Sequence, residues 1–177
     1  MPDTATQNLL DQELVGRWAL DTEHTTVSFA HKTMWGLVTV KGTFSAVEGA
    51  GQVEPGGVLT GTLVLSASSI DSGNKKRDTH LRSADFFDAG RYPNLDLRIL
   101  AGTMVDGQVQ LRSELTVKGI SEPQTLVAHI TESTPTSVTV AVEAEVDRDR
   151  FGLSWNKGGM IKGLTKVHVN ARFTRVS

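Results

Sequence analysis

The sequence predicts an all-β fold, an eight-stranded antiparallel barrel with one short helix between strands near the barrel mouth. Apolar and polar side chains alternate with a period of two along most of the chain, glycine-rich or polar turns separate these stretches, and one segment rich in lysine and arginine breaks the alternation. The alternation gives each strand one dry and one wet face, which is typical of antiparallel sheets. About eight such strands can close into a barrel and so remove their edges.

The alternation is clearest in residues 138–147 and 166–174, where every second residue is apolar, so that one face of each strand is apolar throughout. A barrel of this size either holds one small ligand or is filled by its own side chains, and the pattern is compatible with both. Turns are expected at 48–51, 55–57 and 106–107, where glycine is frequent. The expected strands are 16–20, 25–33, 38–47, 58–67, 94–103, 108–117, 125–131 together with 137–146, and 166–176.

Residues 74–82 are expected to form the short helix. Asp71, Ser72 and Asn74 are possible N-caps, and Ser83 can cap one further turn over 84–88. Pro93 ends this region, because the residue before a proline disfavours helical backbone. Since the segment lies between strands in mid-chain, we expect it to lie across one end of the barrel.

The length of 177 residues suits one domain, which we place at 15–177, after an N-terminal arm at 1–14. A net charge of -2 argues against a nucleic-acid partner, which needs a concentrated basic face. The chain has no cysteine, which excludes disulfides and thiolate chemistry. It has neither a secretory signal nor a long apolar stretch, so we expect a cytoplasmic protein that does not span a membrane.

The usual catalytic motifs are incomplete. Residues 152–156 resemble a nucleophile elbow but lack its final glycine. Gly158 and Gly163 have the spacing of a phosphate-binding loop, but the required lysine is absent. His24 and His31 are seven residues apart and therefore point to opposite faces of a strand, which argues against a shared metal ion. We expect no metal, no cofactor and no catalytic residue.

Two places can nevertheless contact a ligand. His31 lies an even number of residues from Val27 and Phe29, so it points to the same dry face of its strand. It is therefore either a hydrogen-bonded interior histidine or a group that orients a ligand. The segment around the helix is either a surface helix with its own ion pairs or a lid over the mouth. In the second interpretation Phe86 and Phe87 would plug the interior, and three residues would meet a polar head group: Arg77, His80 and Arg82.

Five segments of the chain resemble the YceI-like family of polyisoprenoid-binding, lipocalin-like proteins. The most specific lies between Ser68 and Pro93, and the others are 18–31, 40–44, 115–120 and 147–154. The resemblance implies a lipocalin-like barrel that binds an isoprenoid chain or another long amphiphile, and it implies a homodimer, which is common in the family. Family members often carry an acidic pair after the last glycine, whereas here Gly163 is followed by Leu-Thr-Lys.

The leading hypothesis is therefore a carrier or storage protein for a long apolar or amphipathic ligand, a polyprenyl pyrophosphate or a quinone-like lipid. One alternative is an enzyme that acts on a lipid in the same cavity, with His31, His80 and Asp78 as acid–base candidates. Another is a stress-related interaction module with a filled barrel. The residues expected to line the cavity are Val27, Phe29, His31, Phe44, Leu63, Ile70, Phe86, Phe87, Leu111, Leu115, Val140, Val142, Phe151, Trp155 and Phe173.

Overall fold

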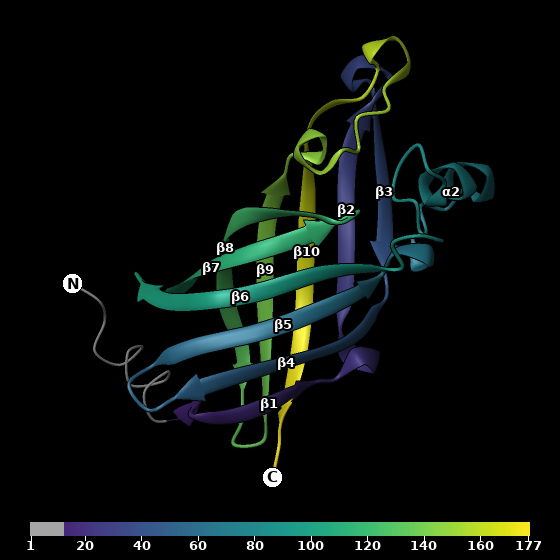
Figure 1. Ribbon diagram of the computed structural model, residues 1–177. Helices are drawn as coiled ribbons and strands as arrows, with labels where there is room; N and C mark the ends of the chain where they lie inside the picture. Colours follow the sequence, from purple (N-terminus) through teal and green to yellow (C-terminus); the bar gives the residue numbers. More distant parts are fainter. Residues whose placement is uncertain (1–12) are drawn as a thin grey trace.

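The computed structural model describes residues 13–177 and confirms the antiparallel barrel (Figure 1). One sheet has the strand order β1-β4-β5-β6-β7-β8-β9-β10-β2-β3, and pairing of β1 with β10 closes it, so the closed ring contains every strand except β2 and β3. The ring therefore has eight strands, the number predicted, although the predicted set included β2 and β3, which lie outside the ring. The strands are β1 (Gly16–Leu20), β2 (Thr26–Thr33), β3 (Val38–Phe44), β4 (Ala46–Glu54), β5 (Val58–Ser66), β6 (Asn94–Val105), β7 (Gln108–Val117), β8 (Ile120–Ser133), β9 (Ser137–Val146) and β10 (Lys162–Arg175).

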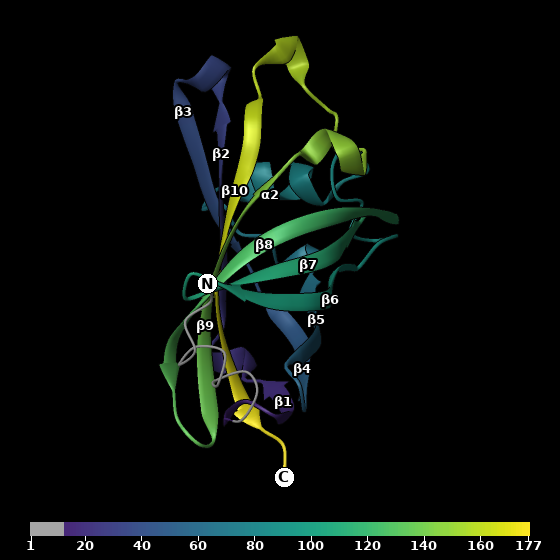
Figure 2. The same cartoon turned by 90° about the vertical axis from the view of Figure 1, so that its left-hand side faces the viewer.

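Strand β10 has two partners on the same edge. Its last residues, including Phe173 and Arg175, pair with β1 and close the ring. Its first part, from Lys162 to Asn170, pairs with β2 instead. The β2–β3 hairpin therefore extends one wall of the barrel beyond the ring, as Figures 1 and 2 show.

The predicted helix is confirmed as α2 (Lys75–Arg82), which lies beside β3 at the extended end (Figure 1). Asn74 caps it by accepting a hydrogen bond from the backbone N–H of Arg77 at 3.0 Å. The carboxylate of Asp78 is buried and accepts hydrogen bonds from the backbone N–H and the hydroxyl of Ser72. These bonds fix the loop before the helix. The expected turn at 84–88 forms as hydrogen-bonded turns rather than as a helix.

Two strand predictions were wrong. Residues 48–51 are not a turn but the centre of β4, and the segment at 38–47 is two strands that meet at Ser45. Gly49 of β4 makes room for a side chain of β1, because a Cβ at this position would lie 3.0 Å from Leu20. Gly49 therefore indicates close packing here rather than a chain reversal.

Segments 125–131 and 137–146, which were counted together, are β8 and β9, joined by a turn at 134–136. The turns at 55–57 and 106–107 are confirmed. The barrel consequently has longer walls on this side than the sequence predicted, because β8 extends to Ile120 and Ser133.

The end of the barrel opposite α2 is closed by packed apolar side chains, among them Leu14, Trp18 and Val53. Arg175 holds this end together: its guanidinium donates hydrogen bonds to the carbonyls of Val15, Glu13 and Pro135 and lies 4.3 Å above the Trp18 ring. Most of the predicted arm at 1–14 lies outside the described residues. Among residues 13–177, no helix has the length and apolar character needed to cross a bilayer.

We expect Arg175→Ala to lower the free energy of unfolding by about 2 kcal/mol, because three hydrogen bonds from a charged group are lost at once. Urea denaturation measures this change. Arg112→Ala, at an exposed position of β7, is the matched control and should change stability by less than about 0.5 kcal/mol. Equal losses in the two variants would contradict the assigned role of Arg175.

Candidate ligand-binding cavity

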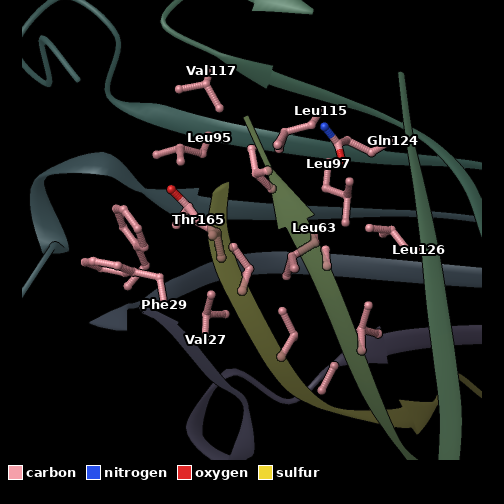
Figure 3. A pocket seen from close by; sticks show the side chains of 18 of the residues that line it. Val27, Phe29, Leu63, Leu95, Leu97, Leu115, Val117, Gln124, Leu126 and Thr165 are labelled. Carbon is pink, nitrogen blue, oxygen red and sulfur yellow. The ribbon is translucent and has the colours of Figure 1, made fainter. Parts of the chain in front are cut away.

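The barrel encloses a cavity of about 900 Å³. Its walls come from every strand of the ring and from β2, β3 and α2. Figure 3 shows apolar side chains from opposite walls, such as Val27, Leu63 and Leu115, pointing into one shared space. The volume lies in the upper part of the range of small-molecule sites, about 300–1,000 Å³.

The inward side chains do not fill the barrel. Leu63, Leu97, Val140 and Val142 point inward, yet each is only half-buried, because part of its surface faces the cavity. Phe151, in contrast, is completely buried near the mouth. The alternative of a filled barrel is therefore wrong. The valines and alanines of β9 and β10 are too short to reach the opposite wall.

All the residues predicted to line the cavity do line it. Alternation of inward and outward side chains was sufficient to identify the strand residues among them. Other lining residues were not named from the sequence: Leu14, Trp18, Val53, Leu59, Leu95, Ile99, Val109, Leu126 and Val169. Several of these lie an even number of residues from a predicted lining residue on the same strand. Applying the alternation to every strand would therefore have found them.

Of the three predicted head-group residues, Arg77 and His80 line the cavity and Arg82 does not. Arg82 turns away from the cavity because its guanidinium donates hydrogen bonds to the carbonyls of Ser68 and Ile70, at 2.8 and 3.0 Å. It therefore anchors α2 to the loop that precedes the helix. The expectation of a mouth position for Arg82 is corrected.

The cavity reaches the surface at the end that bears α2. There its lining includes the exposed residues Met34 and Val38 of the β2–β3 hairpin and Lys76 of α2. His80 packs edge-to-face against Trp155, with ring centroids 4.5 Å apart, and links the helix to the segment after β9. One end of the cavity is thus closed and apolar, and the other is an open mouth between the hairpin and the helix.

His31 is the polar group that faces the cavity from β2. Its Nδ1 is hydrogen bonded to the Thr165 hydroxyl at 2.7 Å, whereas its buried Nε2 has no hydrogen-bond partner among the described residues. Burial, and secondarily the positive charge of Arg148, lower the pKa of His31. The imidazole is therefore neutral at neutral pH, and its ring lines the cavity while its Nε2 is buried without a partner within residues 13–177.

Arg148 is a further polar residue of the lining, and sequence reasoning gave it no role. Its side chain is 11% exposed and lines the cavity. The guanidinium donates hydrogen bonds to the carbonyls of Leu153 and Trp155, at 2.6 and 2.9 Å. Burial lowers the pKa of Arg148, although an arginine stays charged in proteins. Its sequence context, a charged Asp-Arg-Asp-Arg run, is typical of a surface turn and gives no sign of burial.

The three acid–base candidates do not come together. Asp78 binds Ser72 in the loop before α2, His80 Nε2 lies 2.9 Å from the carboxylate of Asp85, and His31 pairs with Thr165. General acid–base catalysis requires such groups to converge on one reacting atom. The three groups therefore do not form one acid–base site.

Solved structures with the same fold confirm the barrel. The BcnA protein of Burkholderia cenocepacia superposes with a TM-score of 0.75 at 19% identity, over 86% of this chain and 98% of that one. A polyisoprenoid binding domain from Saccharophagus degradans, implicated in plant cell wall breakdown, has a TM-score of 0.69 at 14% identity, over 90% and 98% of the two chains.

Sequence comparisons identify the family. A UPF0312 protein of Staphylococcus aureus (strain USA300) is 26% identical over 170 residues, which are 89% of this chain and 96% of that protein. UPF0312 proteins of Vibrio cholerae are 29% identical over 113 residues, 60% of this chain, and the match spans 58% of their length. The model of the YceI-like domain matches residues 18–173. The chain therefore belongs to the YceI-like family.

Proposed function

We propose that the protein binds a long-chain isoprenoid lipid inside the barrel and carries or stores it. The observation that carries the proposal is the apolar cavity of about 900 Å³, closed at one end and open at the other. Each methylene that leaves water for such a site contributes about 0.8 kcal/mol. A flexible hydrocarbon chain can therefore bind tightly without specific contacts. The description of the Saccharophagus degradans neighbour as a polyisoprenoid binding domain supports the proposal.

The polar groups define how the lipid would lie. The tail would extend toward Leu14 and Trp18 at the closed end, and the head group would stay near His31 and Arg148, which are close enough to influence each other electrostatically. A phosphate or a quinone carbonyl oxygen would accept a hydrogen bond from the neutral imidazole and interact with the guanidinium. Arg77 and His80, at the mouth, would contact a larger head group.

Binding rather than catalysis is the function that the site favours, because its acid–base groups have separate partners and its walls are apolar. A cytoplasmic location and a homodimer stay predictions. Cell fractionation tests the location, and sedimentation velocity of the purified protein tests the dimer.

A bulky side chain in the cavity should remove lipid binding. We expect Val142→Trp to weaken the binding of a prenyl ligand by about tenfold or more, because the indole occupies space that the tail needs. Extraction with organic solvent followed by mass spectrometry should find isoprenoid lipid on the native protein and much less on this variant. Fluorescence displacement with farnesyl and longer prenyl chains gives the affinities.

Glu143→Trp is the matched control, since Glu143 is the adjacent, exposed residue of β9. It should bind ligand like the native protein. If both tryptophan variants bind equally well, or if the native protein neither carries lipid nor takes up prenyl chains, the proposed function is wrong.

Replacement of His31 should separate head-group recognition from tail burial. We expect His31→Leu to bind a prenyl pyrophosphate about tenfold more weakly, because one hydrogen bond to a charged group is lost. The same variant should bind a hydrocarbon such as squalene at least as well as the native protein. Isothermal titration with both ligands measures the difference. An equal loss for the two ligands would mean that His31 only shapes the cavity.

A further inference from the structure

Large apolar side chains are exposed at the tip of the β2–β3 hairpin and at the start of β10. We define them as the apolar tip: Met34 (44% exposed), Trp35 (56%), Leu37 (86%), Val38 (46%) and Leu164 (47%). Large apolar side chains that are exposed close together on a protein surface mark an interaction site. Figures 1 and 2 both show the β2–β3 turn and the loop before β10 side by side at the far end of the extended wall, away from the C-terminus.

The tip is a defined unit rather than two independent loops. The backbone N–H of Trp35 donates to the carbonyl of Met160 at 2.9 Å, and its indole N–H donates to the carbonyl of Gly158 at 3.2 Å. The indole is therefore held in place while more than half of its side chain faces solvent. A tryptophan with one polar contact and an exposed ring is typical of side chains that lie in a membrane interface.

The backbone of the turn is unfavourable for the residues that it contains. Met34 and Trp35 have φ angles of 51° and 55°, in the left-handed region that favours glycine or asparagine. Neither the exposure of these side chains nor their backbone geometry stabilises the isolated chain. Strain and exposed apolar surface in one turn point to a partner that covers the turn.

Positive charges surround the tip. Lys32, Lys157 and Lys162 are exposed there, and Lys32 lies directly opposite Lys162 in the pairing of β2 with β10. Two like charges in this position repel each other across the strands. Residues 31–47 and 150–177 contain no aspartate or glutamate, although the whole chain has a net charge of -2. In the pairing of β9 with β10, Glu145 faces Lys166, further from the tip.

We propose that the apolar tip docks into the surface of an anionic lipid bilayer, with its lysines on the lipid head groups. Anionic head groups would relieve the repulsion between Lys32 and Lys162, and the acyl boundary would cover the exposed indole and leucines. A second copy of the chain suits the tip less well. It would bring lysines against lysines, and a stable dimer needs about 20 residues or more from each partner, far more than this tip offers.

Docking at this tip would also place the cavity mouth against the bilayer. Met34 and Val38 belong both to the tip and to the cavity lining, and Met160 and Ile161 line the cavity from the loop that binds Trp35. A lipid could then pass between bilayer and barrel without crossing water. This consequence rests on the proposed lipid binding, whereas docking itself depends only on the tip.

Cosedimentation of the full chain with vesicles tests the proposal. Binding is expected to vesicles that contain phosphatidylglycerol and to be much weaker with phosphatidylcholine alone. We expect Leu37→Ser to weaken binding about tenfold by removing apolar contact. The double variant Lys32→Gln/Lys162→Gln should bind about tenfold more weakly and lose much of the salt dependence. All of these positions are exposed, so no variant should lower the thermal stability, and loss of the repulsion between Lys32 and Lys162 should if anything raise it.

Leu100→Ser is the matched control, at an exposed leucine on the outer wall of β6, and should bind vesicles like the native protein. Equal losses in Leu37→Ser and Leu100→Ser, or equal binding to the two kinds of vesicle, would overturn the proposal. So would a dimer in sedimentation velocity that Leu37→Ser dissociates. The variant Val142→Trp should still dock although it loses its lipid, so a failure of docking is distinguished from a failure of the proposed function.

Discussion

The shared edge of β10 is the constraint on which the rest of the structure depends. Hydrogen bonding of its last residues to β1 closes an eight-stranded ring, and hydrogen bonding of its first part to β2 raises one wall above that ring. A strand edge can pair with only one partner at each point, so β1 and β2 must divide β10 between them. The closed end opposite α2, the open mouth and the projecting hairpin all follow from this division.

Side-chain size then decides that the barrel is hollow. The inward positions of β9 and β10 are mainly valine and alanine, such as Val140, Ala144 and Val169, which leave the centre of the ring empty. Larger side chains gather at the two ends, with Trp18 at the closed end and the aromatic rings of Phe86 and Trp155 at the mouth. Burial at the ends supplies the tertiary packing, while the middle keeps room for a ligand.

The polarity of the side chains also changes along the barrel, from the closed end to the mouth. The closed end is sealed by apolar packing and by Arg175, whose hydrogen bonds go to the chain itself. Toward the mouth, His31 and Arg148 face the cavity, and beyond them lie the exposed apolar and basic side chains of the tip. This gradient, from apolar interior to polar neck to interfacial surface, matches the polarity of an amphiphile that sits in a membrane.

Period-two alternation in the sequence was sufficient to determine the all-β fold, most strands and several of the strand residues that line the cavity, because the direction of a strand side chain depends only on its parity. The cluster of possible N-caps at 71–74 likewise indicated where α2 begins, and the structure shows that Asn74 is the cap. Tertiary structure alone decided that Gly49 and Gly51 lie within β4, because the pairing with β1 and the close contact of Gly49 with Leu20 come from a distant part of the chain. It also decided that Arg82 points away from the cavity, that Arg148 faces it, and that Lys32 meets Lys162. Each of these depends on contacts between residues distant along the chain, which local pattern does not encode.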